Sequence, residues 1–199
     1  MLENELLYDQ ALLNRAHTLA LELGSLLKAR NIMLTLAESC TGGMVAETIT
    51  SLPGSSAWFD YGLVTYSNQS KIALLKVLSQ TLETHGAVSE AVAKEMALGC
   101  LNRIASDKMQ AYITGSIEGR GEIRTHGGFK AQAYISGSIT GIAGPDGGTA
   151  EKPVGTVCFA WAGLNLPVKT QTKIFSGNRQ QIRQQATVFM LQKLIKRLG

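Results

Sequence analysis

The turn at residues 38–43, ESCTGG, brings together a carboxylate, two hydroxyls and a thiol. It follows an apolar segment at 32–36 and precedes a helical pattern at 44–52, so it joins a strand to the N-terminus of a helix. Ser39 or Thr41 could cap this helix, because one hydroxyl is enough for capping. A helix N-terminus also presents N–H groups and a positive dipole end to an anion. The turn carries more polar groups than a cap needs, which favours a binding or catalytic site.

A second candidate site is the glycine-rich stretch at residues 140–149, TGIAGPDGGT. Glycine loses much backbone freedom in a helix and proline lacks a donor, so this stretch is expected to form a loop. The N–H groups of such a loop can turn toward an anion, and a strand-like segment at 154–161 follows at once. In α/β proteins this is a common place for a phosphate or carboxylate, although an elaborate surface turn would look similar. The loop matches neither the P-loop nor the dinucleotide-binding pattern.

Length and composition predict one globular domain. The chain has 199 residues, of which 45% are hydrophobic, and a net charge of +4; this is enough chain for a real core. No apolar run approaches the roughly 18 residues of a membrane span, and the acidic residues 1–5 argue against a signal peptide. Cys40, Cys100 and Cys158 are odd in number and have no CxxC spacing, which predicts free thiols in a reducing cytoplasm.

The end of the chain is basic. Residues 179–199 contain no Asp or Glu but carry Arg179, Arg183, Lys193, Lys196 and Arg197. Such a run can bind nucleic acid, but the same segment has an apolar face at helical spacing. We therefore expect solvated cations on the outer face of a packed helix, and neither nucleic acid nor a membrane as a partner.

Hydrophobic periodicity predicts the elements that position these groups. Helices are expected over 5–29, 44–52, 70–77, 79–84, from a Ser89 cap to 104, and over 179–197. Strands are expected at 32–36, 61–66 and 109–114, followed by a hairpin of 154–162 and 168–175. Alternating helices and strands followed by a hairpin predict a three-layer α/β/α domain with a mixed, mostly parallel sheet.

An internal repeat interrupts this order. QAYITGSI at 110–117 recurs as QAYISGSI at 132–139, with polar, glycine-rich residues 118–130 between the copies. Two copies are too few for a solenoid, which needs about three or more, so the repeat indicates an insertion at about 116–141. We expect an exposed, mobile excursion there, unless the second copy docks into the sheet in place of the first.

Four long motifs resemble the CinA C-terminal-domain family, which includes competence-damage-inducible proteins and stand-alone nicotinamide-nucleotide amidohydrolases. These motifs are AESCTGG, PGSSAWFDYGLVTYSNQSK, HGAVSE and TGIAGPDGGTAEKPVGTV, in family order and broken only by the insertion. The resemblance implies a single α/β/α domain over residues 1–199 that hydrolyses the carboxamide of a small-molecule substrate. That substrate is nicotinamide mononucleotide, and the products are nicotinate mononucleotide and ammonia. The resemblance also implies a homodimer.

Amide hydrolysis without a metal needs an activated nucleophile, an oxyanion site and an acid for the leaving group. His17, His85 and His126 are scattered, so neither a metal site nor a Ser-His-Asp triad is expected, and no cofactor is predicted. A lysine can act as the base where burial or nearby positive charge lowers its pKa from about 10.4.

The resemblance carries a catalytic Ser-Tyr-Lys set over to Ser56, Tyr66 and Lys71. Ser56 is the expected nucleophile, Lys71 the base, and Tyr66 a proton relay or oxyanion donor. Ser56 could instead cap a turn, and Lys71 could be solvated. Ser39 and Cys40 are rival nucleophiles.

The expected substrate-binding residues come from the two loops and from the resemblance. They are Glu38, Ser39, Thr41, Gly42, Thr140, Gly141, Gly144 and Arg179. Arg179, in FSGNR, is expected to hold a nucleotide phosphate with two hydrogen bonds. Thr114 is a rival of Thr140, which we favour because it is continuous with the glycine loop. Glu38 either orients Lys71 or Ser39, or is structural.

A non-catalytic nucleotide-binding or regulatory protein is the alternative function, if the insertion disturbs the site. Ammonia release from nicotinamide mononucleotide distinguishes the two functions.

Overall fold

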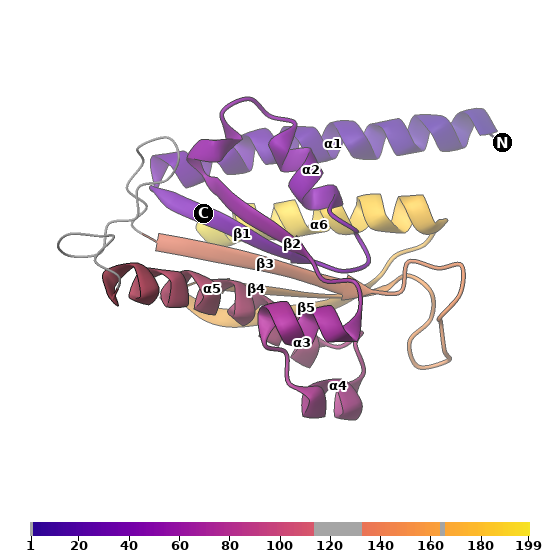
Figure 1. Ribbon diagram of the computed structural model, residues 1–199. Coiled ribbons are helices and arrows are strands. Elements are labelled where there is room, and N and C mark those ends of the chain that lie inside the picture. Colours follow the sequence, from indigo (N-terminus) through magenta and orange to yellow (C-terminus); the bar gives the residue numbers. More distant parts are fainter. Residues whose placement is uncertain (1, 114–132, 164–165) are drawn as a thin grey trace.

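The computed structural model describes residues 2–113, 133–163 and 166–199. Its centre is a five-stranded sheet in the order β2-β1-β3-β4-β5 (Figure 1). The strands are β1 (Ile32–Glu38), β2 (Phe59–Val64), β3 (Ala133–Gly141), β4 (Thr156–Gly163) and β5 (Leu166–Ile174). β1 pairs in parallel with β2 and β3, whereas β4 is antiparallel to β3 and β5. β4 alone therefore runs against the other four strands.

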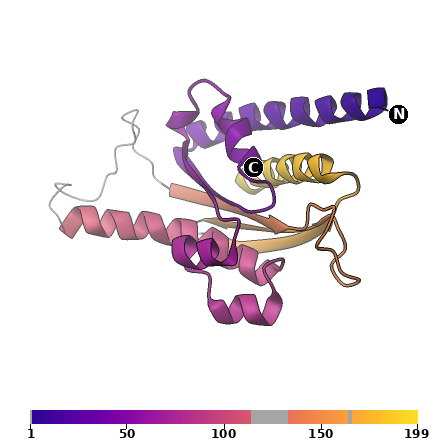
Figure 2. The ribbon, with the colours of Figure 1, turned by 45° about the vertical axis from the view of Figure 1, so that its right-hand side comes forward.

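Helices cover both faces of the sheet (Figures 1 and 2). One face carries α1 (Leu2–Ala29), α2 (Met44–Thr50) and α6 (Arg179–Leu198). The other carries α3 (Asn68–Leu75), α4 (Ser79–His85) and α5 (Glu90–Ile113), and a short 3₁₀ turn, η1 (Ser55–Ala57), precedes β2. The predicted three-layer α/β/α architecture with a mixed sheet is confirmed. β1 is buried along nearly its whole length because helices lie on both of its faces.

The main core lies between the sheet and the layer of α1 and α6. Leu23 and Leu27 of α1, Phe159 of β4 and Leu194 of α6 are fully buried there. Burial of each such large apolar side chain contributes about 1.5–3 kcal/mol. This packing fixes α6 across the sheet, and with it the arginines near the start of α6.

The two copies of the internal repeat have different structures. Residues 133–141 of the second copy and its continuation form β3, the middle strand of the sheet. Residues 109–113, predicted as a strand, are instead the end of α5, so that prediction is wrong. The sheet has one position between β1 and β4, and the second copy fills it because it leads directly into the glycine loop and β4.

The second copy is also bound to the helical layer. Ser136 and Ser138 donate to the carbonyl oxygens of Ala97 and Ala93 of α5, at 2.7 and 2.5 Å. The docked alternative for the second copy is thus the one observed. Thr114, the rival of Thr140, and the part of the expected excursion up to residue 132 lie outside the described residues.

Candidate active site

The candidate site lies where the carboxyl ends of β1, β2 and β3 meet, the usual position for a site in an open α/β sheet (Figure 1). Ser39 follows β1, Tyr66 follows β2, and Thr140 lies near the end of β3. The backbone N–H of Ser39 donates to the carbonyl of Ile139 at 2.9 Å. Parallel pairing therefore brings together three loops that are far apart in the sequence.

The buried side chain of Lys71, in α3, extends to this end of the sheet. Its side chain is 1% exposed, and its Nζ lies 3.1 Å from Ser39 Oγ, 2.7 Å from the Thr65 carbonyl and 3.1 Å from the Tyr66 carbonyl. Ser67 caps α3 by accepting from the N–H of Ser70 at 3.0 Å, which fixes the helix start beside Lys71. The structure thus places Lys71 with Ser39.

Burial lowers the pKa of the Lys71 amine, because it removes water from the charged form. A neutral amine has two N–H donors and one lone pair. The carbonyls of Thr65 and Tyr66 can only accept, so they would take the two donors. The lone pair would then face the Ser39 hydroxyl, as general-base activation requires.

Glu38 has a structural role at the start of α2. Its carboxylate accepts from the N–H groups of Gly43, Val45 and Ala46, at 3.0, 3.2 and 2.8 Å. Gly42 and Gly43 have φ values of 61° and 92°, which favour glycine, so the turn can fold back onto the carboxylate. Within the described part of the chain, none of the hydrogen bonds of Glu38 or Lys71 joins the two side chains. Of the alternatives left open by the sequence, the contacts favour the structural one.

Cys40 is buried beside Ser39, and burial raises the pKa of its thiol to about 12. The nucleophilic form of cysteine is the thiolate, which is scarce at neutral pH with such a pKa. The Cys40 Sγ lies 3.0 Å from where a side chain on Gly141 would begin, so glycine allows the two loops to pack closely. Cys40 is therefore a packing residue and a poor nucleophile.

Arg179 links the glycine loop to Tyr66. Asn178 caps α6 in a reciprocal capping box with Gln181, which fixes the first turn of the helix. From that turn, Arg179 Nη1 donates to the Gly144 carbonyl at 2.7 Å and Nη2 donates to the Tyr66 hydroxyl at 3.1 Å. Both partners are neutral, so these contacts leave the guanidinium charge uncompensated.

Arg183 is a site residue that sequence reasoning missed. Its Nε and Nη2 both donate to the carbonyl of Thr41, at 3.2 and 2.7 Å. The usable signal was its spacing, because Arg183 lies four positions after Arg179 and hence on the same helix face. Two arginines of α6 therefore hold the two loops of the site.

Three threonine hydroxyls lie at or near the site edge. Thr140 donates to the Ala87 carbonyl at 2.8 Å, on the side of the sheet that α5 covers. The buried hydroxyls of Thr41 and Thr65 have no hydrogen-bond partner within the part of the chain that the structure describes. Buried hydroxyls usually find partners, so these two are candidates for contact with a ligand.

Ser56 lies elsewhere. It is exposed in η1, before the start of β2, whereas Tyr66 and Lys71 lie beyond the end of that strand. β2 has six residues, and at about 3.3 Å per residue it separates Ser56 from Tyr66 by about 20 Å. Within one chain, Tyr66 and Lys71 therefore lie close to Ser39 and far from Ser56.

Neither a metal-binding cluster nor a membrane-spanning helix is found among the described residues. Within residues 2–113, 133–163 and 166–199, no three His, Cys, Asp or Glu side chains gather as a metal site would need. Over the same ranges, no helix has the length and apolar character that a membrane span demands.

Comparison with known proteins gives concordant matches. The family model "CinA C-terminal domain" matches residues 16–128 and 125–198. "Nicotinamide-nucleotide amidohydrolase PncC" of Enterobacter agglomerans is 47% identical over 182 residues, covering 92% of this chain and 94% of that protein. The protein of the same name from Escherichia coli K12 is 46% identical, covering 87% of this chain and 88% of that protein.

A solved structure agrees with these matches. The competence/damage inducible protein CihA from Agrobacterium tumefaciens superposes with a TM-score of 0.75 at 34% identity, covering 92% of this chain and 94% of that one. Sequence and fold thus agree along most of the chain, which belongs to the CinA C-terminal domain family.

Proposed function

We propose that this protein is a metal-independent amidohydrolase that converts nicotinamide mononucleotide to nicotinate mononucleotide and ammonia. The observation that carries the proposal is the buried Lys71 amine 3.1 Å from the Ser39 hydroxyl, at the carboxyl edge of the parallel strands. The names of the relatives from Enterobacter agglomerans and Escherichia coli support this choice of substrate.

In the proposed reaction, Ser39 Oγ attacks the carboxamide carbon while its proton passes to the Lys71 amine. The C–N bond of the resulting tetrahedral intermediate then breaks as the Lys71 ammonium protonates the departing nitrogen, which leaves as ammonia. This leaves a nicotinoyl ester on Ser39 and a neutral Lys71. Lys71 next takes a proton from a water molecule as the water oxygen attacks the ester carbon. The Lys71 ammonium then returns this proton to Ser39 Oγ as the ester C–O bond breaks, and the product carboxyl group loses its proton to solvent.

Ser39 is proposed as the nucleophile in preference to Ser56, the serine expected from the resemblance. Ser39 is already hydrogen-bonded to the proposed base, whereas Ser56 lies about a strand length away in the same chain. Tyr66 is better placed to contact the substrate than to relay a proton, because its hydroxyl meets Arg179 and only its carbonyl meets Lys71.

Arg179 is proposed to bind the substrate phosphate. Its present partners are a carbonyl and a phenol, so a phosphate dianion would meet an uncompensated guanidinium. The loops that Arg179 and Arg183 hold supply the remaining contacts, with Thr41, Gly42, Thr140, Gly141 and Gly144 as the proposed lining. The homodimer and the cytoplasmic location expected from the sequence stay predictions.

The decisive experiment measures ammonia and nicotinate mononucleotide after purified protein is incubated with nicotinamide mononucleotide. Equal amounts of both products are expected, and the Lys71→Met variant should form neither at a measurable rate. If the wild-type protein binds the nucleotide but releases no ammonia, the non-catalytic alternative would be correct.

A further inference from the structure

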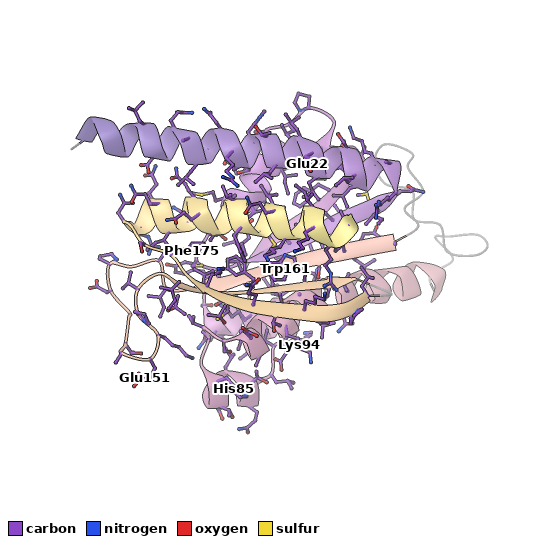
Figure 3. All side chains as sticks on the ribbon, turned by 180° about the vertical axis from the view of Figure 1, so that it is seen from behind. Glu22, His85, Lys94, Glu151, Trp161 and Phe175 are labelled. Carbon is purple, nitrogen blue, oxygen red and sulfur yellow. The ribbon has the colours of Figure 1, made fainter. Side chains whose placement is uncertain are left out.

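A basic cavity lies far from the candidate active site, between β5 and the second half of α6. Its volume is about 290 Å³, and its lining includes Lys169, Gln171, Lys193, Lys196 and Arg197. The cavity reaches Trp161 of β4, which Figure 3 labels between α6 and the edge of the sheet. None of these residues belongs to the candidate active site.

The cavity carries four cationic side chains, and none of the described residues that line it has a carboxylate. The sequences of β5 and α6, LPVKTQTKI and RQQIRQQATVFMLQKLIKRL, contain no Asp or Glu, and neither does that of β4. Lys173 of β5 adds a further charge nearby, 5.8 Å from the centre of the Phe189 ring. Gathering like charges around one concave surface raises the free energy of the folded state, and a bound anion would reverse that effect.

Arg197 is held in place within this cavity. Its Nη2 donates to the Pro167 carbonyl at the start of β5, while its buried Nε has no acceptor among the described residues. A guanidinium that the Pro167 carbonyl already orients needs little further ordering to bind an oxyanion. Burial lowers the pKa of Arg197, as expected for a cation without a neighbouring anion.

The stabilisation of the helix terminus is not a sufficient explanation for this cluster. Lys196 and Arg197 lie in the last turn of α6, where cations interact favourably with the helix dipole. Lys193 lies earlier on the helix, and Lys169 lies on a different element. Lys193 is fourteen positions after Arg179, about 21 Å along the helix at 1.5 Å per residue, so the cavity and the catalytic edge are separate.

We propose that this cavity binds a compact, multiply charged phosphate anion, either free pyrophosphate or the terminal phosphates of a nucleoside triphosphate. Three or four negative charges on one small group match the four cations, and arginine with lysine is a usual donor set for phosphate. The volume is at the lower end of ligand pockets. Trp161 is 4% exposed and offers no face for a base to stack on, so a nucleoside would extend into solvent.

The test is calorimetric titration of the full-length protein with inorganic pyrophosphate at about 0.15 M ionic strength. The double variant Lys193→Gln/Lys196→Gln is compared with the matched control Lys76→Gln/Lys94→Gln. This control removes the same charge from the residue that ends α3 and from α5, on the other face of the sheet. For the wild-type protein we expect one site per chain. The dissociation constant should rise at least about tenfold in the cavity variant and stay unchanged in the control. Equal weakening in both variants, or no binding to wild type, would overturn the proposal.

Parallel titrations with ATP and AMP distinguish the sources of the anion. If ATP binds as tightly as pyrophosphate and AMP binds much more weakly, the ligand is the terminal phosphates of a nucleotide. If pyrophosphate binds tightly and ATP does not, the ligand is the free anion. Because Arg179 is itself proposed to bind a nucleotide phosphate, each titration is repeated with the cavity variant. AMP binding that is as tight as that of pyrophosphate and is weakened in the cavity variant would contradict the need for several charges.

Thermal unfolding of the same proteins gives a readout that does not depend on a binding heat. Without pyrophosphate, the cavity variant should unfold at a higher temperature than wild type, because charge repulsion is relieved. With pyrophosphate, wild type and control should gain stability and the cavity variant should not. Lys169→Gln, at an exposed position of β5 that also lines the cavity, repeats the comparison if the double variant folds poorly. Equal gains in all proteins would contradict a specific site.

Discussion

The Lys71 amine and the Ser39 hydroxyl lie 3.1 Å apart, although 32 positions separate them in the chain. Parallel pairing of β1 and β2 produces this contact, because it places the carboxyl ends of both strands at one edge. Lys71 reaches the edge from α3, the helix that follows β2. The proposed nucleophile thus comes from the connection after β1, and the proposed base from the helix after β2.

Replacement of the two candidate serines distinguishes between them. Ser39→Ala removes the hydroxyl that meets Lys71, so kcat with nicotinamide mononucleotide should fall by about 10³-fold or more. Ser56→Ala should stay within about threefold of wild type, and circular dichroism should show both variants folded. The reverse pattern, with Ser56→Ala inactive and Ser39→Ala active, would return the nucleophile to Ser56.

The pH dependence of kcat/KM should report the Lys71 amine. Only the neutral amine can accept the Ser39 proton, so activity should rise with pH and reach a plateau above the folded-state pKa of Lys71. Burial lowers that pKa, so the midpoint should lie below the usual value of about 10.4. Lys71→Arg keeps a cation that does not titrate and should be inactive throughout. An activity that falls as pH rises from about 7 to 9 would contradict Lys71 as the base.

Arg183 should act on turnover more than on substrate affinity. Arg183→Gln removes two hydrogen bonds to the Thr41 carbonyl and loosens the turn that holds Ser39. We expect kcat to fall about 10–100-fold with little change in KM, because a small displacement of reacting groups is costly. Gln185→Ala is the matched control, since its side chain also bonds a backbone carbonyl from α6 but outside the site. Equal losses in both variants would indicate general destabilisation of α6.

Arg179 should act mainly on affinity. Arg179→Gln removes the cation proposed to bind the nucleotide phosphate, so KM for nicotinamide mononucleotide should rise at least about tenfold. The KM for the nucleoside that lacks the phosphate should change little in the same variant. If both substrates are affected alike, Arg179 holds the loops together and does not bind phosphate.

Chelation should leave the activity intact. The proposed reaction uses a hydroxyl and an amine, so incubation with EDTA followed by desalting should not change kcat. Ammonia release before and after treatment is the measurement, with a known zinc amidase treated in parallel. Loss of activity that zinc or manganese restores would show a metal-dependent reaction.

Local sequence signals were sufficient for most of the elements. Ser89 was predicted to cap a helix, and its hydroxyl accepts from the N–H of Val92 at the start of α5. The helix predicted over 44–52 is observed as α2, which ends at Thr50, just before the turn that contains Pro53 and Gly54. Capping and turn formation depend on side chains within a few residues, so the sequence alone determines them.

Only the tertiary structure decided which copy of the repeat becomes a strand and which serine meets Lys71. Both copies have strand-forming residues, but the sheet has one position beside β1, and continuity with β4 assigns it to the second copy. Ser39 and Ser56 both lie beside glycine-containing turns, but Ser39 follows β1 whereas Ser56 precedes β2. Because β1 and β2 are parallel, one serine lies at the site edge and the other at the opposite end of the sheet. These outcomes depend on contacts between distant segments, because pairing and packing of whole strands override local preference.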